Sequence, residues 1–298
     1  MCTIQWGIGA RQTKQICSWN EEEEFLRVKT ALLKLGFRYG ARRKGAECPL
    51  KRSFIAQYGG SDVALTDLNS RIKTLARCMF EAKHLVMFTG AGISTESGLP
   101  DFRGPDGIWT RQAKGLPPKP RPFSSVEPNA GHMAIFELQK LGKLGFLISQ
   151  NVDNLHLMSG IHPSLLAELH GNVTKLRCTR CEAQVDRSPG LTSCPSCGGK
   201  LVSSVVNFGQ PVPRNELAES YRNSKHCDLF IVAGSSLVVT PAADMPKVAL
   251  ESGARLVVIN RGETPFDRVT HLRFGEGIGE VLPSAVAELK RLMKISGE

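Results

Sequence analysis

The sequence lacks any apolar run that approaches the roughly 20 residues needed to span a bilayer. Its first residues, MCTIQWGIGARQTKQ, also lack the basic-then-apolar order of a signal peptide. We therefore expect a cytoplasmic protein with no membrane partner, and a nuclear location stays open. Disulfides are rare in these reducing compartments, so we expect the nine cysteines to remain free of disulfide bonds.

The sequence also lacks the concentrated positive charge of a nucleic-acid-binding protein. Its formal net charge is +10, but residues 1–65 alone supply +5, with 11 Lys and Arg against 6 Asp and Glu. The longer remainder is therefore only mildly basic. Charge alone does not indicate nucleic acid as a partner.

Residues 1–65 show little sustained hydrophobic periodicity. A run of four glutamates at 21–24 precedes one short amphipathic pattern at 25–35, which predicts a helix. We expect this segment to be a poorly ordered N-terminal extension with no chemistry of its own. A partner-binding arm is the alternative.

From residue 66 onward, helical and strand-like patterns alternate. Strands that alternate with helices favour a parallel sheet with helices on both faces, so the predicted fold class is α/β. The expected helices lie near 66–79, 132–140, 214–225, 242–252 and 281–294, and the expected strands at 85–88, 145–149, 229–232 and 256–259.

A glycine-rich stretch, GAGISTESGLPDFRGPDGIWT, follows the first predicted strand at residues 90–110. Glycine lets backbone N–H groups approach phosphate oxygens closely, because no Cβ stands between them. The dinucleotide fingerprint of ordinary dehydrogenases lacks its third glycine here, since Thr95 occupies that position. The stretch therefore predicts a nucleotide site, but not a hydride-transfer site of the usual kind.

Two C-x-x-C pairs, separated by twelve residues, give a second signal: Cys178, Cys181, Cys194 and Cys197. Two such pairs can close a tetrahedral site around Zn²⁺, and four protein ligands leave no open position. We therefore expect one structural zinc ion per chain. Because the pairs interrupt the sheet-forming sequence, they predict a small inserted zinc-ribbon domain at about 173–204.

Polar clusters stand at further strand ends. They are QNVDNLH at 150–156, ELHGN at 168–172 and GSS at 234–236. In an open α/β sheet, ligands bind beyond the carboxyl ends of the strands. The small residues at 234–236 suit phosphate, and Asn260 and Arg261 could hold a ribose or an adenine.

Taken in order, GAGISTESGLPDFRG, QNVDNLH, LHGN, the paired C-x-x-C, NFGQPVP, GSSLVVTP and VVIN resemble the sirtuin (Sir2) family from about residue 66 to 294. The segment GPDGIWT is similar to the branch that carries G-P-x-G-x-W. NFGQPVP departs from the commoner F-G-E at Gln210, and no Tyr-x-x-Arg pair typical of desuccinylases follows Trp109. The resemblance implies a large Rossmann-like domain and a small zinc-binding domain, with NAD⁺ and acyl-lysine between them.

The resemblance also implies an activity. It is the NAD-dependent removal of acetyl or other acyl groups from protein lysines, giving nicotinamide and O-acyl-ADP-ribose. The partners would be acylated lysine-containing proteins or peptides. Two alternatives remain: an NAD-dependent protein mono-ADP-ribosyltransferase, and a non-enzymatic zinc-ribbon adaptor.

The implied site residues fall into three groups. His170 would be the general base, because a neutral imidazole can accept a proton from a ribose hydroxyl near pH 7, and Asn151 and Asp153 would orient nicotinamide and ribose. The NAD⁺ contacts would come from Gly90, Ala91, Gly92, Thr95, Asp101, Phe102, Arg103, Trp109, Gln150, Asn151, Asp153, Gly234, Ser235, Ser236, Asn260, Arg261 and Ile278. The substrate peptide would contact Val205, Val206, Asn207, Phe208 and Val238. For the neighbouring histidines, we expect His156 to be buried and His162 to be solvated.

Overall fold

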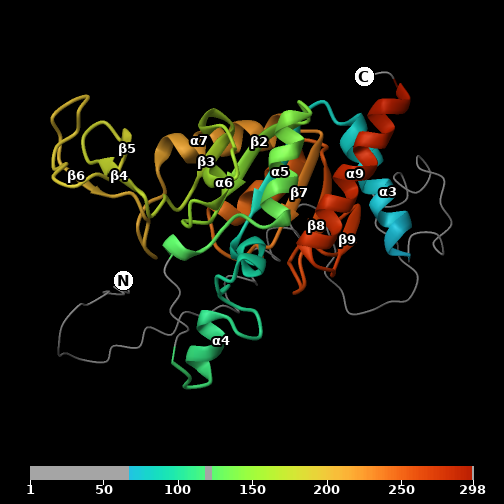
Figure 1. Ribbon diagram of the computed structural model, residues 1–298, viewed down its shortest axis with the longest axis horizontal. Helices are drawn as coiled ribbons and strands as arrows, with labels where there is room; N and C mark the ends of the chain where they lie inside the picture. The colour runs from blue at the N-terminus through green and yellow to red at the C-terminus, as the bar shows by residue number, and fades with distance from the viewer. Residues whose placement is uncertain (1–66, 118–122, 297–298) are drawn as a thin grey trace.

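A computed structural model describes residues 67–117 and 123–296 (Figure 1). The expectations for residues 1–65, including the helix at 25–35, lie outside the described residues. The helices are α3 Leu68–Glu81, α4 Ile108–Ala113, α5 Ala130–Lys140, α6 Leu155–Met158, α7 Arg214–His226, α8 Met245–Glu251 and α9 Ile278–Ser296. None of the helices in these ranges combines the length and apolarity that crossing a bilayer requires.

Six parallel strands form the main sheet, in the order β3-β2-β1-β7-β8-β9. Their bounds are β1 Leu85–Thr89, β2 Leu144–Ser149, β3 Leu166–Glu168, β7 Leu229–Ala233, β8 Arg255–Ile259 and β9 Leu272–Phe274. The order reverses between β1 and β7, which is the switch point of a doubly wound fold. The predicted α/β class with a Rossmann-like parallel sheet is confirmed.

Helices cover both faces of this sheet, and the alternation of side chains along β1 shows how. Leu85 and Met87 join a core formed with α3, α5 and α9. Val86 and Phe88 point to the opposite core, which includes Met245 of α8. Because both faces are covered, all five residues of β1 are buried, and the strand reads as one apolar run.

A second, antiparallel sheet lies between β3 and α7 in the chain. It has the order β5-β4-β6, with β4 Lys175–Cys178, β5 Gln184–Asp186 and β6 Leu201–Ser203. Figure 1 shows these strands at one end of the molecule, with α3 and α9 at the other. This small sheet carries the two C-x-x-C pairs.

The structure corrects several predicted boundaries. Within the glycine-rich stretch, Ala91–Ser97 forms a short 3-10 helix that the sequence did not predict. The helix expected at 242–252 is a 3-10 helix, Ala242–Asp244, followed by α8. Pro246 explains the break, because proline has no N–H for the carbonyl at position 242. The last helix begins at Ile278 rather than at 281.

The loops after β1 and β7 touch through their backbones at the switch point. The Gly92 N–H donates to the Gly234 carbonyl oxygen at 2.8 Å. A Cβ on Gly92 would lie 2.7 Å from the Gly234 Cα, and a Cβ on Gly234 would lie 2.3 Å from the Ile93 nitrogen. Both distances are too short for any side chain, so both positions require glycine.

We expect Gly234→Ala to destabilise the fold more than Gly253→Ala does. Both glycines have positive φ, at 71° and 89°, but a Cβ on Gly253 would meet nothing within 4 Å. Gly253→Ala should therefore cost only the backbone strain of about 1–2 kcal/mol. Gly234→Ala should add roughly 1–3 kcal/mol of overlap. Chemical denaturation of both variants measures the difference, and equal losses would contradict the steric argument.

Candidate functional site

The carboxyl ends of β1, β2, β3 and β7 meet at one edge of the main sheet. The loops that leave these ends carry most of the predicted site residues. A buried polar cluster lies where the loops after β1 and β2 meet. The Ser94 hydroxyl donates to Asp153 Oδ2 at 2.6 Å, and Asn151 Nδ2 donates to Ser94 Oγ at 3.0 Å.

Asp153 is held in this cluster as a buried carboxyl group. Only 6% of the residue is exposed, and its second oxygen accepts the Leu155 N–H at 3.0 Å. Burial raises the pKa of Asp153, and the Ser94 hydroxyl opposes that shift. Roles are predicted from the sequence for Asn151 and Asp153 but not for Ser94, although Ser94 belongs to the glycine-rich stretch that follows β1.

His170 follows β3, and its orientation fixes its tautomer. Its Nδ1 lies 2.9 Å from the Gln150 carbonyl oxygen, which can only accept a hydrogen bond. Nδ1 therefore carries the proton, and the lone pair is on Nε2. Burial lowers the pKa of His170, while the hydrogen bond to Gln150 acts in the opposite direction. The imidazole is thus neutral near pH 7 and can accept a proton at Nε2.

A second group of contacts spans the switch point from the other side. Ser235 Oγ donates to Gln150 Oε1 at 2.7 Å, and Arg103 Nη1 donates to Ser236 Oγ at 3.1 Å. The Arg103 guanidinium also lies 4.4 Å from the centre of the Trp109 ring. A cation beside small hydroxyl residues at a glycine-rich loop suits a phosphate ligand.

Aromatic side chains connect this group to the predicted substrate segment. The rings of Phe102 and Trp109 are 5.1 Å apart, and those of Trp109 and Phe208 are 5.6 Å apart. The Val206 N–H donates to the His170 carbonyl oxygen at 2.9 Å. The structure therefore brings the segment 205–208 next to both the aromatic residues and the His170 loop. Val205, Val206, Asn207 and Phe208 lie outside the regular strands, as does the buried Val238.

Other predicted site residues are engaged locally. Asp101 accepts the Gly104 N–H at 2.9 Å, and Thr95 Oγ1 donates to the Gly92 carbonyl at 2.9 Å. Asn260 Nδ2 donates to the Gly262 carbonyl at 2.8 Å beside the exposed Arg261. The Ile278 side chain packs in the core at the start of α9.

Two further histidines, His132 and His156, lie near the carboxyl end of β1. His156 Nε2 is 2.8 Å from Thr89 Oγ1, and the His132 and His156 rings are 5.0 Å apart. Burial lowers the pKa of His132 to about 4 and that of His156 well below its usual range. The predictions of a buried His156 and an exposed His162 are confirmed.

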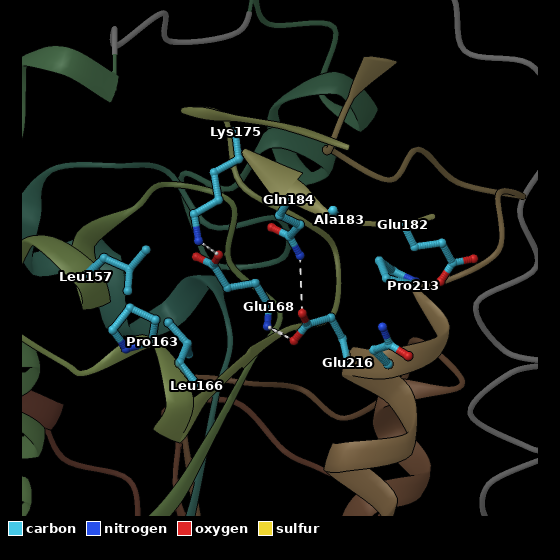
Figure 2. Close-up of a pocket in the computed structure, with 11 residues that line it drawn as sticks. Leu157, Pro163, Leu166, Glu168, Lys175, Glu182, Ala183, Gln184, Pro213 and Glu216 are labelled. Atoms are coloured by element: carbon cyan, nitrogen blue, oxygen red, sulfur yellow. Dashed lines mark hydrogen bonds and ion pairs between the residues drawn. The ribbon is translucent and has the colours of Figure 1, made fainter. Parts of the chain in front are cut away.

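A cavity of about 340 Å³ lies where the small sheet meets the main sheet (Figure 2). Its polar wall includes Glu168 of β3, Lys175 of β4, Gln184 of β5 and Glu216 of α7. Burial raises the pKa of Glu216. The cavity does not include the glycine-rich loop or the buried polar cluster, so it is separate from the nucleotide site that the sequence predicts.

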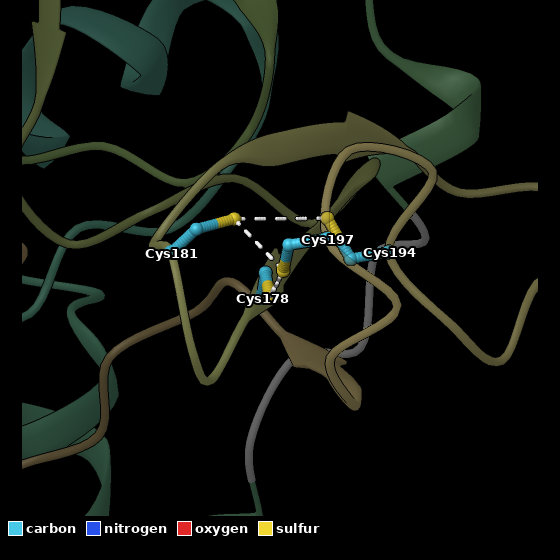
Figure 3. Close-up of side chains that lie close together, drawn as sticks. All are labelled: Cys178, Cys181, Cys194 and Cys197. Atoms are coloured by element: carbon cyan, nitrogen blue, oxygen red, sulfur yellow. Dashed lines mark hydrogen bonds between the residues drawn. The ribbon is translucent and has the colours of Figure 1, made fainter.

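The four cysteines of the paired motifs converge at one point (Figure 3). Their sulfur atoms all lie within 4.8 Å of one another, with separations of 3.5 Å for Cys178–Cys197, 3.7 Å for Cys181–Cys194 and 3.4 Å for Cys181–Cys197. Four sulfurs at about 2.3 Å from a tetrahedral Zn²⁺ would be about 3.8 Å apart. The geometry therefore fits one zinc ion with no open position.

The chain belongs to the Sir2 family, whose profile matches residues 90–126 and 119–241. An NAD-dependent protein deacylase 2 of Archaeoglobus fulgidus is 39% identical over 251 residues, which cover 76% of this chain and 98% of the relative. The NAD-dependent protein deacetylase SRT1 of Oryza sativa subsp. indica is 42% identical over 218 residues. That match covers 69% of this chain but only 45% of the rice protein.

Solved structures of the family share the fold. A Sir2 homolog in complex with NAD has a TM-score of 0.60 and 34% sequence identity, and the match covers 74% of this chain and 94% of the homolog. A Sir2 protein with a p53 peptide and NAD⁺ has a TM-score of 0.56 and 33% identity, with 76% and 98% of the two chains covered. These matches agree with the Rossmann-like fold described above.

We expect the buried His132 to make the protein less stable in mild acid. Its pKa is lower in the folded state, so the unfolded chain binds the proton first as the pH falls below about 6.5. Stability is then lost until the pH reaches the folded value of about 4. Between pH 7 and pH 5 the loss should be about 2 kcal/mol. Denaturation curves of wild type and His132→Gln isolate this contribution, and a flat difference between pH 7 and pH 5 would contradict it.

We expect the purified protein to contain about one zinc ion, and Cys181→Ser to lose it. Loss of a closed structural site removes much of the folding energy of a small domain. Elemental analysis and thermal unfolding measure both effects. Cys227→Ser is the control, because Cys227 is buried outside the cluster and should leave the zinc content unchanged. Cys181→Ser protein with full zinc and an unchanged Tm would refute the assignment.

Proposed function

We propose that this protein removes acyl groups from protein lysines in an NAD-dependent reaction. The observation that carries the proposal is the fixed tautomer of His170, whose Nε2 lone pair is available at the same sheet edge as the Asn151–Ser94–Asp153 cluster. The names of the relatives support the reaction class, because they are NAD-dependent deacetylases and deacylases.

The proposed NAD⁺ site lies at the switch point between β1 and β7. Arg103 and Ser236 would contact the phosphates, and the glycines at 90, 92 and 234 let the loops after β1 and β7 approach each other there. Asn151 and Asp153 would orient the nicotinamide and ribose. When bound, NAD⁺ would supply a ribose carbon whose bond to nicotinamide is already weakened by the pyridinium charge.

His170 would act as the general base. Burial keeps its imidazole neutral, and the Gln150 carbonyl holds the proton on Nδ1, so Nε2 can accept a proton from a ribose hydroxyl. Asp153 is a buried carboxyl group without a cationic partner among the described residues. The positive charge of a bound nicotinamide ring would favour its ionised form.

The acylated peptide would bind along 205–208 and Val238. The hydrogen bond from Val206 N to the His170 carbonyl supports this assignment, because it joins the segment to the loop of the proposed base, and the Phe208 ring contacts Trp109. A Sir2 structure with a p53 peptide and NAD⁺ supports a peptide substrate. The segment GPDGIWT at 104–110 supports the branch that carries G-P-x-G-x-W.

The experiment that tests the activity uses a panel of acyl-lysine peptides with NAD⁺, read by mass spectrometry. Deacylated peptide, nicotinamide and O-acyl-ADP-ribose in equal amounts would support the proposal. Labelled NAD⁺ in the same reaction tests the alternative, because a mono-ADP-ribosyltransferase would place the label on protein. Labelled protein without O-acyl-ADP-ribose would overturn the proposal in favour of that alternative.

We expect His170→Ala to reduce the formation of O-acyl-ADP-ribose by about 10²- to 10⁴-fold, since it removes the general base. NAD⁺ affinity should stay within a few-fold, because the proposed phosphate contacts come from other segments. His162→Ala is the control, since His162 is exposed and should leave turnover almost unchanged. More than a tenth of wild-type turnover in His170→Ala would show that another group is the base.

A further inference from the structure

We propose that Glu168 is a positioning residue for His170, and that it acts through the side chain of Asn172. The proposal rests on the proposed function, in which His170 is the base. Glu168 is the last residue of β3 and only 6% exposed. Its Oε1 accepts from Asn172 Nδ2 at 2.6 Å, so one side-chain contact closes the five-residue loop that carries His170.

Asn172 passes this constraint to the loop after β2. The second hydrogen of its Nδ2 group is used by Asn154 Oδ1 at 2.9 Å, and its Oδ1 accepts from the backbone and side chain of Thr174. The amide of Asn172 therefore has a partner for every donor. Asn154 belongs to the segment that begins with Gln150, whose carbonyl fixes the proton on His170 Nδ1. The contacts therefore form a ring that runs from Glu168 through Asn172 to the segment 150–154, and from Gln150 back to His170.

The backbone leaves little room for another arrangement of this loop. Gly171 has φ 76°, and a Cβ there would lie 2.0 Å from the Ser204 carbonyl oxygen. Ser204 Oγ donates to the Asn172 carbonyl at 2.7 Å and accepts the Asn172 N–H at 3.0 Å. Hydrogen bonds with Ser204 therefore fix the second half of the loop, and the side chain of Glu168 fixes its first residue.

Lys175 supplies the positive charge that pairs with Glu168, as Figure 2 shows. Its Nζ lies 3.0 Å from Glu168 Oε2, and the two side chains are 18% and 7% exposed. Lys175 begins β4, the strand that ends at Cys178. Replacing either charge alone leaves the other unpaired in a largely buried position, so single charge variants would confound positioning with stability.

Two double variants separate these effects. Glu168→Met with Lys175→Met removes both charges of the ion pair and the acceptor for Asn172. Glu168→Gln with Lys175→Met also removes both charges, but the Gln Oε1 can still accept from Asn172 Nδ2. Replacing a buried ion pair by apolar groups of similar volume is often close to neutral for stability. We therefore expect similar Tm values for the two double variants.

Turnover should differ between them. We expect the Met/Met variant to lose 10-fold or more in kcat with KM for NAD⁺ within about 3-fold, and the Gln/Met variant to stay within about 3-fold of wild type. Equal kcat values in the two variants would overturn the proposal. If wild type shows no deacylation, the proposed function fails, and the next measurement still tests the positioning.

That measurement is the ¹⁵N NMR spectrum of the His170 imidazole, which reports the tautomer without any turnover. Wild type and the Gln/Met variant should show the proton on Nδ1, and the Met/Met variant should show a mixture of tautomers. An unchanged tautomer in the Met/Met variant would overturn the proposal. If Met/Met does not fold, Asn172→Ala removes the same contact from the other side. It should give the same mixture, and a wild-type spectrum would again overturn the proposal.

Discussion

The backbone contact between Gly92 and Gly234 is the constraint on which the candidate site depends. It joins the loops after β1 and β7 at 2.8 Å, where the strand order of the sheet reverses. A side chain at either position would push these loops apart, because its Cβ would overlap backbone atoms of the other loop. Ser94 and Ser235 are each placed by one of these loops. The contact therefore holds the loop of Ser94 against the loop of Ser235 at the switch point.

Burial shifts the pKa values of the titratable groups at this edge. Desolvation disfavours the charged form of any group, so it acts in opposite directions on acids and bases. It raises the pKa of Asp153 and lowers those of His132, His156 and His170. The three imidazoles are therefore neutral near pH 7, although one alone has its Nδ1 proton directed at a backbone carbonyl. The same environment thus yields two structural histidines and one proposed base.

The strands at 85–88, 145–149, 229–232 and 256–259 could be predicted because strands covered on both faces read as apolar runs. β3 and β9 have only three residues each, and LAE and LRF carry no such pattern. β3 and β9 are strands because they pair with β2 and β8 in the folded sheet. The same limit applies to the site. Sequence motifs indicated His170 and the cysteines. The hydrogen bond between Arg103 and Ser236, by contrast, joins residues 133 positions apart and forms only in the folded chain.

The cysteine cluster and the proposed base do not need to touch in order to be coupled. A zinc ion with four thiolate ligands has no open position, so its effect on the reaction can only be mechanical. β4 joins the two regions, since it carries Lys175 at one end and Cys178 at the other. Lys175 neutralises the buried Glu168, and Glu168 ties the loop of His170 through Asn172. The small sheet therefore does more than close the fold at one end, because it supplies the positive charge that pairs with Glu168 next to the loop of the proposed base.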